Sequence, residues 1–454
     1  MTNTQSRLKV FLGKTGKQVG TLSYTNQNGR QNSVFDYSQS WKEDPNSFSI
    51  APSMPLKTGR FFANGQNQSL AFPLAICDSC PDAWGAKVVR KALRFDGLKR
   101  KVNDFDLLTL VDDFSRVGAL RYMDEQGEFL TTSPLKGGLR APPLIEMKRL
   151  AEAARALERS EENKSDIEIL RRPGASLGGA RPKASVYDTD KGRLLIAKFT
   201  GAGETKPTER VEVLTLNLAS RVKLNASKAS LYCLSDKEPI ALIERFDRTA
   251  NGNRRLYVSA QTFMDAPQAA DNCTYTEIAD QLRHNASEPE QQLHELFGRV
   301  AFTILVSNSD DHLKNMGFLL TSPNKWELSP MFDVNPDPDR AEDQIDLKTW
   351  ISEESGPSAS IEALIDAAEW FGLTREYAAE KVCSMAEVIS STWKLEAKAV
   401  GLNTSQIKDY HLAFENSETS YALNLGQPKV PGSDFNEGPK AHDNQEPDGP
   451  QPSF

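Results

Sequence analysis

The sequence contains few residues of the kinds that form disulfides or bind zinc. It has 5 cysteines and 5 histidines among 454 residues, and only Cys77 and Cys80 form a C-x2-C pair. A structural zinc site needs a second pair of Cys or His ligands at a similar spacing, which this chain lacks. We therefore interpret these two cysteines as ordinary reduced thiols of a cytoplasmic protein. Zinc binding or redox chemistry at Cys77 and Cys80 is the alternative.

Long hydrophobic runs and an excess of basic residues are also missing. No stretch approaches the roughly 18 apolar residues that a membrane-spanning helix needs. The opening residues, MTNTQSRLKV, lack the apolar core of a signal peptide. The formal net charge is -8, so composition does not indicate a general nucleic-acid-binding surface. We expect a protein without membrane contact.

A polar segment stands out within residues 301–336. Asp310 and Asn315 have the D-x4-N spacing of a protein-kinase catalytic loop, and Asp333 follows in the stretch FDVNP. In that chemistry one carboxylate accepts the proton of the attacking hydroxyl, while the amide and a later carboxylate hold Mg²⁺ against the phosphates. The competing interpretation is a solvated polar turn, because D-x4-N alone is common by chance.

A loop of small residues, PGASLGGARPKASV, occupies residues 173–186. Glycines allow backbone N–H groups to approach phosphate oxygens, and Arg181 and Lys183 add positive charge. A plain flexible turn is the alternative. The loop also contains a G-x-S-x-G pattern centred on Ser176, as in the nucleophile elbow of α/β-hydrolases. That elbow lies between a strand and a helix, whereas another loop and a strand follow here, so we disfavour a hydrolase.

Three further features follow in the order found in kinases. Lys198 lies in an apolar strand at residues 194–199, where a lysine is costly unless it meets anions. Glu212, on an amphipathic helix, would pair with it. The strand that follows leads to a hinge at residues 244–246, whose backbone would bind adenine. The alternatives are an edge strand with its lysine in water, a surface glutamate, and Phe246 as a core residue.

These features predict an α+β fold. Alternating residues at 8–12 and 19–24 predict a hairpin, and Pro81-Asp82 opens a helix. No catalytic residue is expected in this first region. We expect a small N-terminal α/β domain followed by a two-lobed protein-kinase-like core with a mostly helical C-terminal lobe. The predicted parts are the N-terminal domain at 1–135, the N-lobe at 136–248, the C-lobe at 249–425 and a disordered acidic Pro/Gly-rich tail at 426–454.

Several stretches resemble HipA-type serine/threonine kinases, which are toxins of bacterial toxin–antitoxin pairs. They are PDAWGAKVV, GASLGGARPKA, ERFDR, NSDDHLKN with GFL behind it, and FDVNP. The resemblance covers about residues 7–415, and NSDDHLKN and the S-x-G-G-A-R-P-K loop are its most specific parts. Thr303 departs from the family, which often has Asn there, and the tail has no counterpart.

The resemblance assigns a role to each matching residue. Asp310 would be the general base, Asn315 and Asp333 would ligate Mg²⁺, and Ser176 would be autophosphorylated. Glu212 would pair with Lys198, whose ammonium binds the ATP phosphates. The implied ATP-binding residues are Gly178, Gly179, Ala180, Arg181, Pro182, Lys183, Lys198, Glu244, Arg245, Phe246, His312, Lys314 and Phe332.

The resemblance also implies an activity and partners. The chain would be an ATP- and Mg²⁺-dependent protein kinase that phosphorylates itself and a cellular protein, for which an aminoacyl-tRNA synthetase is one known kind of target in the family. A small helix-turn-helix antitoxin would bind it and connect it indirectly to DNA. The alternative is a kinase-fold, nucleotide-binding regulator that acts through the antitoxin and DNA without phosphoryl transfer. The presence of Lys198, Asp310, Asn315 and Asp333 argues against that alternative.

Overall fold

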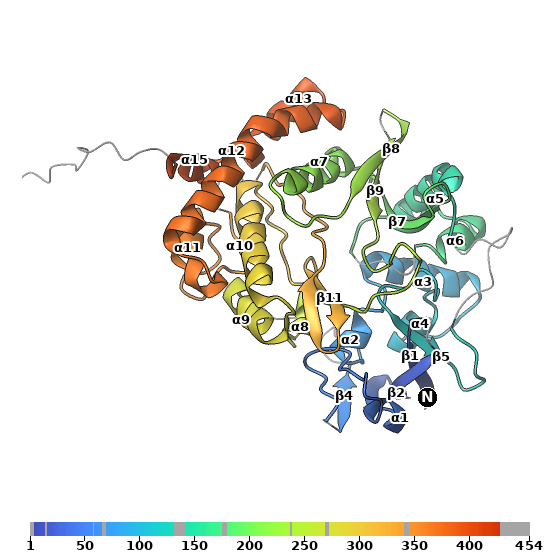
Figure 1. Cartoon of the computed structure of the whole chain (residues 1–454). Helices are drawn as coiled ribbons and strands as arrows, with labels where there is room; N and C mark the ends of the chain where they lie inside the picture. Colours follow the sequence, from blue (N-terminus) through green and yellow to red (C-terminus); the bar gives the residue numbers. More distant parts are fainter. Residues whose placement is uncertain are drawn as a thin grey trace, which may run out of the picture.

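The computed structural model describes residues 4–13, 16–57, 59–65, 70–130, 141–174, 179–236, 238–267, 272–339 and 345–426. In chain order, a five-stranded sheet is followed by a four-stranded sheet and then by a helical lobe (Figure 1). The predicted α+β class is confirmed. The predicted tail beyond residue 426 and the predicted boundary at residues 135 and 136 lie outside the described residues, and the division into domains stays a prediction.

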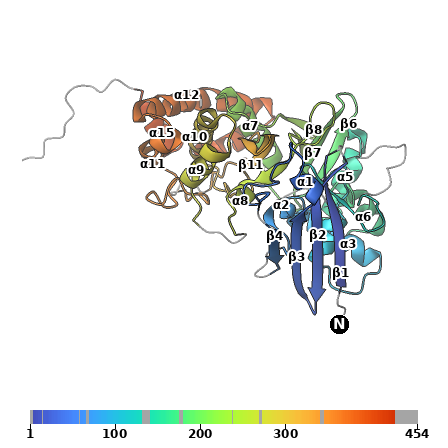
Figure 2. The same ribbon diagram turned by 60° about the horizontal axis from the view of Figure 1, so that its bottom comes forward.

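The N-terminal sheet is antiparallel, with strand order β4-β3-β2-β1-β5 (Figure 2). Period-two alternation places Val10, Leu22 and Phe35 in the core, where each is fully buried. Asn28 and Gly29 connect β2 to β3 with φ angles of 54° and 90°, the left-handed backbone that a two-residue hairpin loop requires. The strands are β1 Thr4–Leu12, β2 Lys17–Gln27, β3 Arg30–Tyr37, β4 Arg60–Asn64 and β5 Leu120–Met123.

Four helices accompany this sheet: α1 Gln39–Lys42, α2 Leu74–Cys77, α3 Ala83–Phe95 and α4 Asp104–Thr109. α3 begins directly after Asp82, as predicted. Val89 of α3 packs against Leu107 of α4. On another face of α3, Trp84 and Val88 join the core beneath the second sheet. This helix therefore connects the N-terminal domain to the part of the chain that carries the predicted site.

The second sheet is antiparallel, with strand order β6-β7-β9-β8. Leu195 and Phe199 of β7 share a core with α5 and α6. Because side chains alternate along a strand, Lys198 points to the opposite face, which α7 covers. The elements are η1 Leu144–Glu146, α5 Met147–Arg159, α6 Lys164–Leu170, β6 Lys183–Asp188, β7 Arg193–Phe199, α7 Thr208–Arg221, β8 Ala229–Ser235 and β9 Glu238–Glu244.

The C-terminal lobe is mostly helical, as predicted, with a small sheet of order β10-β11-β12. Its central helix, α10, has Phe297, Phe302 and Leu305 fully buried and leads directly into the predicted catalytic loop. The strands are β10 Tyr257–Ser259, β11 Gly317–Ser322 and β12 Lys325–Leu328. The helices are α8 Ala260–Phe263, α9 Tyr275–Asn285, α10 Pro289–Leu305, α11 Ile361–Asp366, η2 Ala368–Phe371, α12 Arg375–Ala399, α13 Thr404–Asp409, α14 His411–Phe414 and α15 Ser417–Asn424. Within the described ranges, no helix is both long and apolar enough to cross a membrane.

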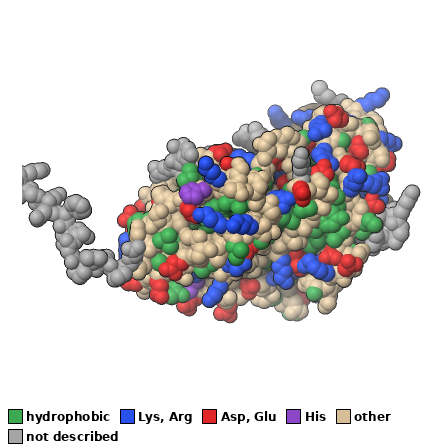
Figure 3. All heavy atoms as spheres, turned by 90° about the horizontal axis from the view of Figure 1, so that it is seen from above, with side chains coloured by type: hydrophobic (Ala, Val, Ile, Leu, Met, Phe, Trp, Pro, Cys, Tyr) green, Lys and Arg blue, Asp and Glu red, His purple; other side chains and the backbone are tan. Residues whose placement is uncertain are grey.

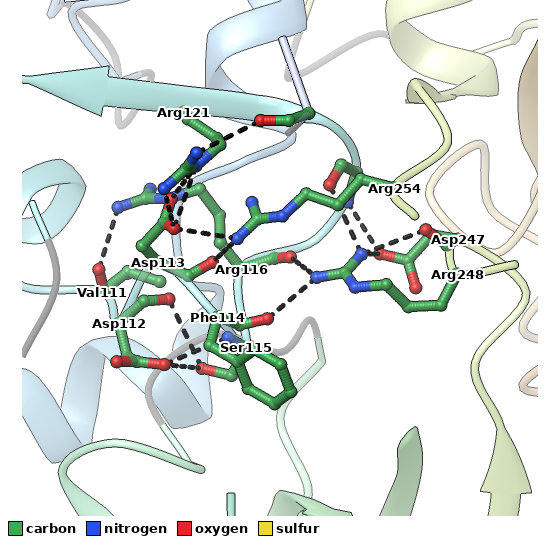
Figure 4. A network of polar contacts seen from close by, with 12 residues as sticks. Val111, Asp112, Asp113, Phe114, Ser115, Arg116, Arg121, Asp247, Arg248 and Arg254 are labelled. Atoms are coloured by element: carbon green, nitrogen blue, oxygen red, sulfur yellow. Dashed lines mark hydrogen bonds and ion pairs between the residues drawn. The ribbon is translucent and has the colours of Figure 1, made fainter. Parts of the chain in front are cut away.

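A buried network of charges joins the N-terminal domain to the segment after β9 (Figure 4). Asp247 binds Arg245 and Arg248, each at 2.6 Å, and accepts a 2.8 Å hydrogen bond from the Gly118 N–H. Arg248 also donates to the Arg116 carbonyl at 2.7 Å. Burial by itself would raise the pKa of Asp247, but the two guanidinium groups outweigh it and the net shift is downward.

A second buried aspartate in this network also binds two arginines. Asp113 of the N-terminal domain binds Arg121 at 2.9 Å and Arg254 at 3.0 Å (Figure 4). All three side chains have low exposure, with Asp113 at 4% and Arg254 at 8%. Buried charges persist only where they are paired and hydrogen-bonded. The network therefore fixes the N-terminal domain against the segment at residues 244–254.

We predict that Asp247→Ala destabilises the fold. The change leaves two guanidinium groups buried without their carboxylate, and removing one partner of a buried ion pair typically costs about 3–5 kcal/mol. Urea denaturation should show this as a lower midpoint. Glu125→Ala, in an exposed turn, is the control and should change stability by less than about 0.5 kcal/mol. Equal stability of the two variants would contradict the role given to Asp247.

Candidate functional site

Lys198 lies in a buried cluster of charges. β7 lies between β6 and β9, and Lys198 is 7% exposed, so the alternative of an edge-strand lysine in water is wrong. Its Nζ pairs with Glu212 of α7 and, at 2.8 Å, with Asp333 Oδ1. Burial alone would lower the pKa of Lys198, but the carboxylates of Asp333 and Glu212 outweigh it and raise the pKa. Lys198 therefore keeps its positive charge.

The two carboxylates of this cluster differ in their electrostatics. Burial raises the pKa of Glu212, and Lys198 offsets this only in part. At Asp333 burial also acts upward, but the Lys198 and Lys183 ammonium groups lower the pKa overall. Asp333 has a left-handed backbone with φ 57°, which is uncommon for a residue other than glycine. Such backbone strain clusters at functional sites, and here it accompanies the carboxylate that faces both lysines.

Lys183 is a second buried lysine beside the first. It lies directly opposite Lys198 in the β6–β7 register and is 5% exposed. Within the described part of the chain, its ammonium makes no hydrogen bond or ion pair. Burial lowers the pKa of Lys183, and the neighbouring Lys198 lowers it further. Like charges on directly opposed residues repel, so this pair would bind an additional anion favourably.

The small-residue loop reaches the N-terminal domain. Ser176 and Gly178 lie outside the described residues. Gly179 has φ 91°, a left-handed backbone that favours glycine, and a Cβ there would come into close contact with the Lys183 ammonium. The Gly179 N–H donates to Asp82 Oδ2 at 2.7 Å. Asp82 is at the N-cap position of α3 but caps no helix N–H; its carboxylate holds this loop instead.

The rest of the loop leads into β6. Ala180 is exposed. The Arg181 guanidinium binds Glu204 at 2.6 Å, so its charge is already paired. The Pro182 carbonyl accepts the Phe199 N–H at 2.9 Å and attaches the loop to β7. Of the two basic residues noted in this loop, it is Lys183 that lies beside Lys198.

The predicted catalytic loop closes on itself after α10. The Asn315 side-chain amide donates to the Asp310 carbonyl at 2.7 Å, so the D-x4-N spacing brings these two residues together. The Asp310 carboxylate is half-exposed and forms an ion pair with Lys348. His312 Nδ1 accepts the Lys314 N–H at 3.2 Å. The Lys314 ammonium lies 3.8 Å from Asp82 Oδ1, beside the small-residue loop.

Asp311, next to Asp310, is a buried anchor. Its Oδ2 accepts the Tyr275 hydroxyl at 2.9 Å, and its Oδ1 accepts the Lys348 N–H at 2.8 Å. Burial raises the pKa of Asp311 to about 6, although these hydrogen bonds act in the opposite direction. The carboxyl group therefore connects the catalytic loop both to α9 and to the segment around residue 348.

The predicted hinge offers one residue with an uncommitted N–H. The N–H groups of Glu244 and Arg245 donate to Lys228 and Leu194 carbonyls, and the Arg245 side chain belongs to the Asp247 network. Across the described ranges no hydrogen bond involves the Phe246 N–H. The Phe246 and Phe332 rings lie 5.4 Å apart between centroids. These two aromatic side chains, predicted to line one site, are in contact.

The donor set fits a magnesium ion. Asp333 Oδ2 and Asn315 Oδ1 accept no hydrogen bond from any described residue, and both residues line a cavity of about 40 Å³. Mg²⁺ prefers one or two carboxylate or amide oxygens, with phosphate and water oxygens completing its octahedron. No cluster of three or more His, Cys, Asp or Glu side chains that could hold a metal occurs in the described ranges, so this site would offer one carboxylate and one amide.

Cys77 and Cys80 are both free thiols. Cys80 is buried, which raises its pKa to about 12, while Arg116 acts in the opposite direction. Burial likewise raises the pKa of Cys77. A thiol with a raised pKa is a poor nucleophile and a poor metal ligand at neutral pH, which agrees with the interpretation of these residues as reduced thiols.

Sequence reasoning missed two residues at the site. No catalytic residue was expected in the first domain, yet Asp82 of that domain binds the small-residue loop and faces Lys314. Its only signal was its place in PDAWG, one of the family-like stretches. Lys348 contacts Asp310 and had no signal at all, because nothing in the stretch IDLKTW marks its lysine.

Taken together, the fold and the site define the class of the protein. A strand lysine paired with a helix glutamate lies in a sheet-containing lobe. A D-x4-N loop and a later aspartate lie in or beside a helical lobe. This is the arrangement of kinase-like phosphotransferases, in which the protein positions phosphates and neutralises their charge.

Comparison with known protein families identifies the family. Residues 8–123 match the family model of the HipA N-terminal domain, and residues 175–393 match that of the HipA-like C-terminal domain. The chain belongs to the HipA family, which confirms the resemblance found in the sequence.

Three individual proteins show similarity to part or most of this chain. Toxin YjjJ of Escherichia coli (strain K12) is 26% identical over 175 residues, which are 36% of this chain and only 38% of that protein. A chain of the Shewanella oneidensis MR-1 toxin–antitoxin complex of HipA, HipB and operator DNA has a TM-score of 0.64 at 17% identity, with 92% of this chain and 96% of that one covered. This likeness shows a shared fold. The Helicobacter pylori proinflammatory kinase CtkA gives a TM-score of 0.37 at 15% identity over 55% of this chain and 94% of that chain.

We predict that Asp311 makes stability depend on pH. Its folded-state pKa, about 6, lies above its ordinary value of 3.8, so the folded protein binds the proton more tightly than the unfolded chain. Stability from this group is therefore complete below the ordinary pKa and is lost as the pH rises through about 6. Between about pH 5 and about pH 8, the wild type should lose about 1–2 kcal/mol relative to Asp311→Asn.

Urea denaturation of both proteins at the two pH values measures this difference. The asparagine side chain keeps one oxygen acceptor but cannot titrate, so the variant supplies the matched control. A difference between the two proteins that stays constant with pH would show that Asp311 has an ordinary pKa.

Proposed function

We propose that the chain is an ATP- and Mg²⁺-dependent protein serine/threonine kinase that acts as the growth-arresting toxin of a bacterial toxin–antitoxin module. One observation carries the proposal. Two buried lysines, Lys183 and Lys198, lie side by side, and only Lys198 has carboxylate partners among the described residues. A triphosphate would supply the missing negative charge, with Asp310 and Asn315 at the site where transfer would occur.

Each residue then has a role in the proposed reaction. Lys183 and Lys198 hold the ATP phosphates, and Asn315 and Asp333 hold the Mg²⁺. The metal neutralises phosphate charge when it is bound. Asp310 accepts the proton of the substrate hydroxyl, and its half-exposed carboxylate is open to an incoming protein segment. Phe246 and Phe332 border the adenine.

Self-phosphorylation would regulate this site. Ser176 lies in the loop that precedes Gly179, and a phosphate there would add about two negative charges where the ATP phosphates should bind. Repulsion between like charges would displace the loop and switch the kinase off. Mass spectrometry after incubation with ATP tests this directly, because absence of phosphate on Ser176 contradicts it.

The proposed partners follow from the family. We infer a small helix-turn-helix antitoxin that binds this chain and brings it to operator DNA, as HipB and operator DNA accompany HipA in the Shewanella complex. The net charge is -8, and basic and acidic side chains are interspersed on the face in Figure 3, which supports indirect attachment. The substrate would be a protein of the bacterial cytoplasm, such as an aminoacyl-tRNA synthetase.

We expect Asp310→Asn to abolish phosphoryl transfer while ATP still binds. The amide cannot accept the hydroxyl proton, and loss of a general base typically costs about 10²–10⁴-fold in rate. The test is incubation with Mg²⁺ and γ-labelled ATP followed by phosphopeptide mapping, with ATP binding measured by calorimetry. Asp280→Asn, on the exposed side of α9, is the control and should retain full activity. Undiminished transfer by Asp310→Asn would show that Asp310 is not the base.

We further expect Asp82→Ala to weaken ATP binding. The change removes the acceptor of the Gly179 N–H, and a hydrogen bond to a charged group contributes about 1.5–3 kcal/mol, or roughly 10–100-fold in affinity. The maximal transfer rate should change much less, because Asp82 contacts the loop and not the base. Asp280→Ala, on the exposed side of α9, is the control. Unchanged ATP affinity would contradict the role of Asp82.

A further inference from the structure

Lys348 lies just before Thr349 and Trp350, and its side chain reaches the proposed base, Asp310. Its ammonium forms an ion pair with Asp310 Oδ1. The pair is open to solvent, since the side chains of Lys348 and Asp310 are 53% and 52% exposed. No role has been given so far to this lysine. An exposed ion pair of this kind contributes only about 0–1 kcal/mol to stability, so its value to the fold is small.

The backbone beneath Lys348 is fixed much more firmly than its side chain. The Lys348 N–H donates to Asp311 Oδ1 at 2.8 Å, and the Thr349 hydroxyl donates to the Asp311 carbonyl at 2.7 Å. Asp311 and Thr349 are 7% and 1% exposed. Two successive residues of this segment are thus hydrogen-bonded to the residue next to the base.

A second set of contacts holds the same segment from the other side. The Tyr275 N–H donates to the Trp350 carbonyl at 2.8 Å, and the Trp350 N–H donates to the Cys273 carbonyl at 2.9 Å. The Tyr275 hydroxyl reaches Asp311 Oδ2 at 2.9 Å. Tyr275 therefore binds both the catalytic loop and the Lys348 segment. The backbone of the Lys348 segment is thus held by hydrogen bonds, and the Lys348 side chain extends from it to Asp310, the carboxylate that would accept the substrate proton.

This position constrains what else the ammonium can reach. A hydroxyl that gives its proton to Asp310 lies about 2.6–3.2 Å from the carboxylate, and the phosphorus it attacks lies about 3–3.5 Å beyond. A cation in contact with Asp310 is then within the length of a lysine side chain of the transferring phosphoryl oxygens. A positive charge supplied there in cis stabilises the charge spread over those oxygens in the transition state.

We propose that Lys348 is a further catalytic residue of this kinase, which contacts the phosphoryl group during its transfer. The inference rests on the proposed function. In the step, a bond forms between the substrate hydroxyl oxygen and the γ-phosphorus while the bond from that phosphorus to the β–γ bridging oxygen breaks. The hydroxyl proton moves to Asp310, ADP leaves with the electron pair of the broken bond, and Lys348 shifts from Asp310 to the phosphoryl oxygens.

The test compares Lys348→Met, Lys348→Arg and a matched control. Lys394→Met is the control, because Lys394 is also 53% exposed and pairs with a carboxylate, Glu415, at 2.7 Å in the same lobe. With Mg²⁺ and γ-labelled ATP, the autophosphorylation rate at saturating ATP is measured, together with the ATP concentration that gives half that rate. A charge that acts only in the transition state affects the first quantity and not the second.

We expect Lys348→Met to lower the saturating rate by about 10²–10³-fold and to change the half-saturating ATP concentration by less than about threefold. Lys348→Arg, which keeps the charge, should recover at least about a tenth of the wild-type rate, and Lys394→Met should match the wild type. Circular dichroism and the urea midpoint check that each variant is folded. Lys348→Gln replaces the methionine variant if that one is unfolded.

The other outcomes separate the two proposals. If the wild type transfers phosphate, Asp310→Asn does not, and Lys348→Met is as fast as the wild type, the inference fails while the kinase stands. A Lys348→Met rate above the wild type would also overturn it, because the ion pair would then restrain the base. A wild type that transfers phosphate neither to itself nor to proteins of a bacterial lysate would overturn the proposed function and the inference together.

Discussion

The site depends on two lysines placed opposite each other in a nearly dry layer. Lys183 and Lys198 face one another across the β6–β7 pair, and each is less than a tenth exposed. Glu212 and Asp333 form ion pairs with one ammonium, while the other forms no direct ion pair with any described residue. A fold selected for stability alone would avoid this arrangement, because a buried charge without a partner is expensive. An anionic ligand would supply the missing charge, so the repulsion between the two ammonium groups and the proposed affinity for phosphate would have the same origin.

This constraint explains why the N-terminal domain must be held in place. The small-residue loop is attached through Gly179 to Asp82, which belongs to the N-cap of α3 in the N-terminal domain. The Asp247 and Asp113 networks fix that same domain against the segment after β9 (Figure 4). The domain therefore contacts both the proposed phosphate loop and the proposed hinge.

Local patterns in the sequence predicted many elements of the fold and suggested part of the site. A lysine inside the apolar strand at 194–199 indicated burial, the amphipathic helix placed Glu212, and the D-x4-N spacing brought Asp310 and Asn315 together. Contacts between distant segments could not be predicted in this way. Gly179 and Asp82 are separated by 97 positions, and Lys348 and Asp310 by 38. Such pairs depend on how whole elements pack, and neither Asp82 nor Lys348 stands in a local pattern that sets it apart from a helix cap or a surface charge.

The proposed role of Lys348 follows from where positive charges lie relative to the phosphoryl group that would be transferred. Lys183 and Lys198 lie on the strand lobe, where they would hold the phosphates that stay with the leaving group. On the opposite side, the segment fixed by Asp311 and Tyr275 brings a third ammonium to the base. Charge on the transferring phosphoryl group moves between these two sides as one bond breaks and the other forms. Cations near the leaving-group phosphates alone would stabilise mainly one of the two end states of the transfer. Cations near both the leaving group and the attacking hydroxyl would stabilise the transition state, and only stabilisation of the transition state relative to the reactants makes the reaction faster.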